Sequence, residues 1–340
     1  MEEAFFIQQA KDKMTICKMC RECNGEVCRG LTPGPGGKGT GSTFVRNVAA
    51  LKKIQLKMAV IGHDVQPDTT YNFYSSIISA PIMAAPISNV KINYGSLVDE
   101  QTYLNGLIDG TQEAGVLSFL GDAPAQAMFD LSLDALKKLN GKAIMTIKPW
   151  EMSVFMNRLD LVMAENPMAI AMDIDAGGLT SLRSAHPKVT FMSVEQLRMI
   201  KQKMGSVPLI LKGIMTSEDA MMALDANADA IILSNHGGRV MDQGESSIEV
   251  LQEIVEAVNH RCLILIDGGF RTGSDVFKAL ALGADAVLIG RPFSHASIGS
   301  GKEGVVHLVN RLTRELKDAM MLTQCATLSD IDISKVKVRL

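Results

Sequence analysis

A histidine and an arginine lie three residues apart in a glycine-punctuated turn that follows an apolar segment. The turn reads Ser-Asn-His-Gly-Gly-Arg over residues 234–239, and the preceding run Ala230–Leu233 is typical of a buried strand. His236 can accept or donate a proton near neutral pH. Arg239 offers a planar pair of donors that suits a carboxylate. A base beside a carboxylate-binding group predicts a small acid as the substrate.

Length and composition restrict the class of protein. The chain has 340 residues, of which 47% are hydrophobic, enough for one large α/β domain with additions. Its formal net charge of −3 gives no sign of a nucleic-acid surface. The acidic start lacks the features of a signal peptide, and no apolar run is long enough for a membrane span. We therefore expect no membrane span and a cytoplasmic location with reduced cysteines.

A repeating pattern of short apolar segments, each followed by a helical stretch, begins near residue 76. Segments that are apolar throughout indicate a parallel sheet covered by helices. Eight such units in series predict an α/β fold of the (β/α)8 TIM barrel type; a doubly wound sheet is the alternative. The predicted strands are Ser76–Ile87, Gly115–Gly121, Lys142–Pro149, Ala169–Ala176, Pro208–Gly213, Ala230–Gly237, Cys262–Gly269 and Ala286–Pro292.

Amphipathic stretches separate most of these strands. Helical spacing and cap residues indicate a helix in each, with clear starting signals at Ser193 and Thr216. The predicted helices are Val98–Ala114, Ala125–Leu139, Ser193–Met204, Thr216–Asn227, Ser246–Asn259 and Thr272–Leu282.

The chain before the barrel forms an N-terminal extension in this interpretation. Residues 1–42 comprise a helical stretch over about 3–22, a cysteine-rich segment and a glycine-rich loop. The glycines permit close backbone approach over the mouth of the barrel. We expect the barrel itself to occupy residues 43–340.

Four cysteines in this extension have a spacing that could bind metal. Cys17, Cys20, Cys23 and Cys28 follow the pattern C-x2-C-x2-C-x4-C, which can surround one metal ion or an iron–sulfur cluster. The alternative is four reduced thiols in a loop, since no later Cys or His pair completes a zinc pattern. A metal-bound segment would also suit a docking module for an electron-transfer partner.

Polar residues follow the last two predicted strands in a way that suits a phosphate. In a TIM barrel the site lies at the carboxyl ends of the strands, and phosphates bind after strands seven and eight. Glycine-rich turns there offer backbone N–H groups and a helix start. Arg271 and Arg291 add charged donors. Tight turns alone would also explain the glycines.

Several of these motifs resemble one known family. Residues 234–239 and 267–284 are similar to signature segments of the FMN-dependent 2-hydroxy acid oxidising enzymes, the glycolate oxidase and lactate oxidase group. Residues 212–220, 289–292 and 321–325 also match. The resemblance implies a TIM barrel, bound FMN and oxidation of an (S)-2-hydroxy acid to the 2-oxo acid.

The resemblance also implies roles for particular residues. His236 would be the base, Arg239 would bind the substrate carboxylate, and Lys212 would lie beside the flavin ring. Asp173 would orient the base, with Asp175 as the competing candidate. The residues expected to contact FMN are Ala85, Pro86, Ile87, Lys212, Ser234, Asp267, Gly269, Arg271, Gly290 and Arg291. Arg183 would be a second substrate arginine.

The chain departs from the family pattern where the family has active-site tyrosines. At the position of the family's N-terminal tyrosine this chain has the segment Cys23–Arg29. At the position of the tyrosine on the third strand it has Met145 or a nearby apolar residue. The electron acceptor could be oxygen, a quinone or an electron-transfer protein, and the family implies a homo-oligomer, a tetramer. An FMN-dependent isopentenyl-diphosphate isomerase is the alternative, although its substrate has no carboxylate for Arg239.

Overall fold

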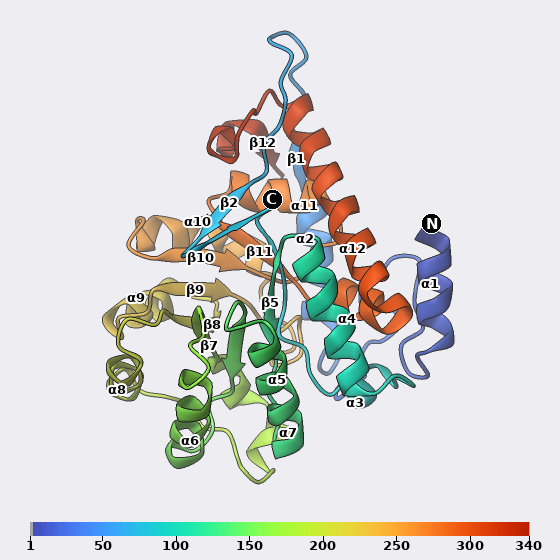
Figure 1. Ribbon diagram of the computed structural model, residues 1–340. Coiled ribbons are helices and arrows are strands. Elements are labelled where there is room, and N and C mark those ends of the chain that lie inside the picture. The colour runs from blue at the N-terminus through green and yellow to red at the C-terminus, as the bar shows by residue number, and fades with distance from the viewer. Residues whose placement is uncertain (1–2, 340) are drawn as a thin grey trace.

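The computed structural model describes residues 3–339 and contains a closed barrel of eight parallel strands (Figure 1). The strand order is β10-β11-β4-β5-β6-β7-β8-β9, so neighbours in sequence are neighbours in space. The predicted (β/α)8 TIM barrel is confirmed. The barrel strands are β4 (Ile82–Ala84), β5 (Leu117–Leu120), β6 (Ile144–Ile147), β7 (Ala169–Asp173), β8 (Leu209–Ile214), β9 (Ala230–Leu233), β10 (Leu263–Ile266) and β11 (Ala286–Ile289).

The first predicted strand, Ser76–Ile87, is in fact two strands. β3 (Ser76–Ile78) pairs antiparallel with β2 (Tyr71–Phe73), and β4 begins four residues after β3 ends. Pro81 lies between them and has no N–H to continue a ladder. The hairpin closes the amino end of the barrel, where Phe73 and Ile78 pack among inward-facing residues of the barrel strands.

Helices surround the barrel and join its strands. Predicted starting signals are confirmed: the Ser193 side chain accepts from the backbone N–H of Gln196, and Thr216 accepts from that of Asp219. The helices after the extension are α2 (Ser42–Lys52), α3 (Val90–Tyr94), α4 (Glu100–Glu113), α5 (Gln126–Lys138), α6 (Met152–Met163), α7 (Thr180–Arg183), α8 (Val194–Met204), α9 (Ser217–Asp225), α10 (Ser247–Val258), α11 (Gly273–Ala281) and α12 (Arg291–Leu322). The long α12 lies beside α4 (Figure 1).

The N-terminal helix is shorter than predicted. α1 (Glu3–Asp12) packs along α12 (Figure 1) and ends well before residue 22. The backbone N–H groups of Thr15 and Cys17 donate to the carbonyls of Gly95 and Tyr94, so they are not available to a continuing helix. Between α1 and α2 the chain forms turns and bends with no further helix.

The glycine-rich loop lies against the mouth of the barrel. The backbone N–H of Lys38 donates to Gly238 O at 2.8 Å, and Arg291 donates to Pro35 O at 2.9 Å. At the far end of the chain, β12 (Val336–Val338) pairs antiparallel with β1 (Ile54–Leu56). Within residues 3–339, none of the helices combines the length and apolar character needed to cross a membrane.

Candidate active site

A cavity of about 390 Å³ opens at the carboxyl ends of the barrel strands. This is a volume typical of small-molecule and cofactor sites. Most residues that the sequence predicts for the site line its wall: Ala85, Pro86, Ile87, Asp173, Lys212, His236, Arg239, Asp267, Gly269, Arg271, Gly290 and Arg291. Ser234 and Arg183 are not on the wall. Residues from six separate strand ends and their loops therefore meet in one place, as a TIM barrel predicts.

The turn after β9 holds His236 in an uncommon backbone conformation. His236, Gly237 and Gly238 have φ angles of 57°, 64° and 80°. A Cβ at Gly238 would lie 2.5 Å from the backbone nitrogen of Phe44, so only glycine lets α2 pack against the turn. Buried Ser234 lies behind the turn, where its Oγ accepts from the backbone N–H of His236 at 3.1 Å. Ser234 thus supports the histidine from outside the cavity.

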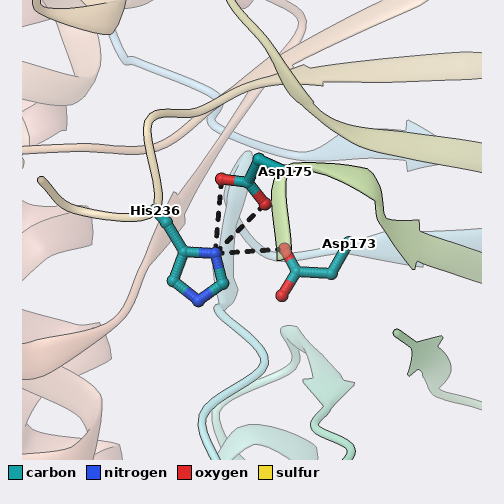
Figure 2. A group of neighbouring side chains, drawn as sticks. All are labelled: Asp173, Asp175 and His236. Carbon is teal, nitrogen blue, oxygen red and sulfur yellow. Dashed lines mark hydrogen bonds and ion pairs between the residues drawn. The ribbon is translucent and has the colours of Figure 1, made fainter. Parts of the chain in front are cut away.

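Two carboxylates face Nδ1 of His236 (Figure 2). Asp175 Oδ1 lies 3.1 Å from this nitrogen and Oδ2 lies 3.3 Å from it, whereas Asp173 Oδ1 lies at 3.6 Å. Nε2, on the other side of the ring, points away from both carboxylates (Figure 2). A carboxylate at Nδ1 fixes the orientation of the ring and leaves Nε2 for proton transfer. Asp175, the competing candidate, is therefore better placed than Asp173 to orient the histidine.

Asp173 is the centre of a buried ion-pair network. Its Oδ1 lies 2.8 Å from Lys212 Nζ, and its Oδ2 lies 3.2 Å from Lys148 Nζ. Burial opposes ionisation, but nearby His236 and the positive charges of Lys212 and Lys148 hold the pKa of Asp173 well below its usual range. Asp173 and Asp267 in turn raise the pKa of Lys212 against the opposing effect of burial. The network therefore places fixed positive charge at the cavity wall.

Lys148 belongs to the site although the sequence analysis did not include it. It follows β6, its side chain is 14% exposed, and it lines the cavity. Its position at the end of a predicted strand was the available signal. Tyr94, in α3, also lines the cavity, so a tyrosine does reach the site from an element that the family pattern did not indicate.

Arg239 is held at the cavity wall by two contacts. Its Nη1 donates to Gly34 O at 2.6 Å, and its Nη2 donates to Asn93 Oδ1 at 2.7 Å. Burial, together with the charge of Arg291, lowers the pKa of Arg239 to about 10, so the guanidinium is charged at neutral pH. Sequence reasoning missed Asn93, because nothing in the segment after β4 marks it as a partner of an arginine 146 residues away.

Arg183 does not take the position expected of a second substrate arginine. Its Nη1 donates to Gly177 O at 3.1 Å, and its guanidinium lies 5.3 Å from the centre of the Phe191 ring. The chain after β7 forms the 3-10 helix η1 (Ile174–Gly178) and then α7, which presents Ser181 and Leu182 to the cavity. Arg183 itself is not among the residues that line the cavity.

The turns after β10 and β11 fit the phosphate and ribityl end of FMN. Asp267 Oδ1 is buried without a hydrogen-bond partner, and burial raises the pKa of its carboxyl group. Gly269 lines the cavity with φ at 91°, and Gly290 caps the start of α12. Arg271 and Arg291 stand on the same wall. Glycine backbone, a helix start and two cations form a donor set that suits a phosphate, and the unpaired Asp267 oxygen is an acceptor that suits a ribityl hydroxyl.

Comparisons with known proteins agree with this geometry. The family model for FMN-dependent dehydrogenases matches residues 143–338. L-lactate oxidase from Lactobacillus jensenii is 31% identical over 325 residues, which cover 87% of this chain and 78% of that protein. 2-Hydroxyacid oxidase 2 from Rattus norvegicus is 29% identical over 320 residues, covering 86% and 88%. A crystal structure of mandelate oxidase superposes with a TM-score of 0.80 at 26% identity and covers 99% of this chain and 98% of that one.

The chain belongs to the FMN-dependent dehydrogenase family, the group of FMN-dependent enzymes that oxidise 2-hydroxy acids. It is an FMN-dependent 2-hydroxy acid oxidoreductase. These relationships give no support to the isopentenyl-diphosphate isomerase alternative.

Proposed function

We propose that the protein oxidises a small (S)-2-hydroxy acid, similar in size to lactate or glycolate, to the 2-oxo acid. The observation that carries this proposal is the common origin of His236 and Arg239. Both side chains come from one rigid turn and line one cavity, and Nδ1 of the histidine is held by Asp175. A base and a carboxylate-binding group at fixed separation suit a substrate whose hydroxyl is on the carbon next to its carboxylate.

Arg239 and His236 have different roles toward the substrate. Arg239 binds the carboxylate through its guanidinium group. Hydrogen bonds to Asn93 and Gly34 fix the orientation of that group. His236 accepts a proton from the substrate at Nε2, and Asp175 stabilises the resulting charge on the ring. FMN, when bound, supplies the two-electron acceptor that the reaction requires.

The cofactor would be held along the opposite wall. The backbone from Ala85 to Ile87 lines the cavity next to Gly290, where an added Cβ would lie 3.1 Å from Ile87 Cδ1. We propose that this surface contacts the flavin ring and that Lys212 supplies positive charge beside it. Arg271, Arg291 and Gly269 would hold the phosphate end. Asp173 keeps Lys212 in place and is a positioning residue in this account.

The substrate side chain would meet an apolar part of the wall. Ile92, Leu179, Leu182 and Ala185 line the cavity from the segments after β4 and β7. Neither segment offers a further arginine to the cavity among the described residues. This surface favours an alkyl group over a second carboxylate.

The remaining proposals concern the organisation of the protein. We propose a barrel over residues 43–340 that is preceded by the extension 1–42, supported by the start of α2 at Ser42. We also propose a homo-oligomer, a tetramer by analogy with the family, and a cytoplasmic location. Oxygen, a quinone and an electron-transfer protein are the candidate acceptors.

Product analysis tests the proposed function. The FMN-loaded protein is incubated with (S)-lactate or glycolate and an artificial redox dye, which makes the result independent of the natural acceptor. We expect pyruvate or glyoxylate in amounts equal to the dye reduced, and none from His236→Gln with FMN still bound. Absence of a 2-oxo acid with the wild-type protein, over a series of 2-hydroxy acids of increasing chain length, would refute the proposal.

A further inference from the structure

The cysteine-rich segment packs directly behind the phosphate end of the main cavity. Cys20 and Cys23 line a second cavity of about 440 Å³, and Gly269 and Arg271 line both cavities. The Cys23 carbonyl accepts from Nε and Nη2 of Arg271 at 3.0 and 2.8 Å. The segment is therefore fixed to the barrel at the wall between the two cavities.

The other two cysteines, Cys17 and Cys28, flank this pair in the sequence. Cys17 Sγ lies 3.5 Å from Nε2 of His295, which also lines the second cavity. Gly25, with φ at 88°, turns the chain back between Cys23 and Cys28, and Cys28 Sγ lies 3.8 Å from the Gly25 carbonyl. Cys17 and Cys23 therefore contact two residues, His295 and Arg271, that line the same cavity.

Neither a disulfide nor a single metal ion fits this arrangement. All four cysteines are free. A tetrahedral zinc with bonds of about 2.3 Å needs its sulfurs roughly 3.8 Å apart. Among residues 3–339, the one group of three or more potential ligands whose atoms come within 4.8 Å of one another is Asp173, Asp175 and His236. No three of the cysteine sulfurs therefore all lie within 4.8 Å of one another, which is too wide a spacing for one ion. A polynuclear centre, in which each thiolate binds a different iron, needs this wider spacing.

The surroundings supply positive charge for an anionic centre. Arg271 Nη2 lies 3.6 Å from Cys23 Sγ. A cluster held by four thiolates carries net negative charge, and nearby donors to its sulfurs stabilise it. Arg271 at Cys23 and His295 at Cys17 provide such groups here.

We propose that Cys17, Cys20, Cys23 and Cys28 bind an iron–sulfur cluster of the [4Fe–4S] type. The spacing C-x2-C-x2-C within the segment is that of bacterial cluster-binding sequences, and Cys28 supplies the fourth thiolate. The proposal concerns binding alone and does not depend on oxidation of a hydroxy acid.

The test is iron and sulfide analysis of the full chain purified without oxygen, and again after reconstitution with ferrous iron and sulfide under reducing conditions. We expect about four irons and four sulfides per chain, a broad brown absorbance, and an electron paramagnetic resonance signal after reduction with dithionite. The variant C17S/C20S/C23S/C28S should lose all three. Cys262→Ser, which changes a partly buried cysteine outside the segment, should keep them.

The wild-type protein alone can overturn the proposal, so the result does not depend on folding of the quadruple variant. Zinc in place of iron, or no iron after reconstitution, would overturn it. Equal iron in the quadruple variant and the wild type would do the same. FMN content, measured on each sample, reports separately on whether the barrel is intact.

Discussion

Asp175 places a carboxylate oxygen 3.1 Å from Nδ1 of His236, although the two residues are 61 positions apart in the chain. The pairing depends on the end of β7. Asp173 is the last residue of that strand, and the 3-10 helix that follows brings Asp175 over the histidine. Asp173 lies at 3.6 Å and is engaged by two lysines. The two acids therefore have different partners.

Asp175→Asn should reduce turnover by about 100-fold or more, because the carboxylate no longer holds the histidine ring or stabilises its charge. The KM should change little, since Asp175 does not line the cavity. Separate measurement of kcat and KM checks this split, and partial rescue by Asp175→Glu would support a positioning role. A raised KM with unchanged kcat would contradict it.

Asp173→Asn should lower the free energy of unfolding by about 3–5 kcal/mol, because it leaves buried lysine charges without their partner. The side chains of Asp173 and Lys212 are only 2% and 4% exposed. Urea unfolding measures the effect. Asp109→Asn is the matched control, since it breaks an exposed ion pair with Lys138 and should cost less than about 1 kcal/mol. Equal effects of the two substitutions would count against the buried network.

The same carboxylate predicts the pH dependence of stability. The pKa of Asp173 is lower in the folded protein than in the unfolded chain, so the unfolded state binds more protons in acid. The stabilising contribution of the Asp173 carboxylate is complete above its pKa in the unfolded chain, which is about 3.9. It is lost as the pH falls through the pKa of Asp173 in the folded protein. The wild-type protein should therefore lose more stability than Asp173→Asn on acidification below about pH 4, as measured by urea unfolding at several pH values.

Arg239→Lys should raise the KM for the hydroxy acid by about 10- to 100-fold, because one point charge replaces a two-pronged donor worth roughly 1.5–3 kcal/mol. Steady-state kinetics measure this change. Arg46→Ala serves as the control, since Arg46 is half-exposed and pairs with Glu249 away from the cavity. An unchanged KM in Arg239→Lys would show that the carboxylate binds elsewhere.

Phe73→Ala should cost about 3–5 kcal/mol of stability while leaving kcat and KM near their wild-type values. Phe73 is fully buried where the β2–β3 hairpin closes the barrel, at the end opposite the site. Thermal unfolding and kinetics on the same sample separate the two effects. Loss of activity in the still-folded variant would mean that the hairpin affects the site.

The barrel could be predicted from the sequence because each strand is a short apolar segment bounded by polar residues and glycine. The helices α6 and α12 were missed. α12 contains Gly299, Gly301 and Gly304, which weaken its helical signal, and it is interrupted at Ser300 and Gly301. The extent of α1 was wrong because tertiary hydrogen bonds to the segment after α3 took the place of helical ones.

The residues of the site that follow strands were predictable, because parallel strands bring their carboxyl ends together. His236 after β9 and Asp267 after β10 belong to this group. Asn93, Tyr94 and the orientation of Arg183 were not predictable, because α3 and α7 are helices too short to show a periodic pattern in the sequence. The choice between Asp173 and Asp175 also required coordinates, since either acid could face the histidine.

Reduction of the bound flavin without oxygen tests the central claim most directly. The FMN-loaded protein is mixed anaerobically with (S)-lactate, (R)-lactate or glycolate, and the flavin absorbance is followed. We predict bleaching by (S)-lactate or glycolate, none by (R)-lactate, and none in His236→Gln despite a normal flavin spectrum. A flavin that no 2-hydroxy acid bleaches, or one that bleaches equally well in His236→Gln, would contradict the account.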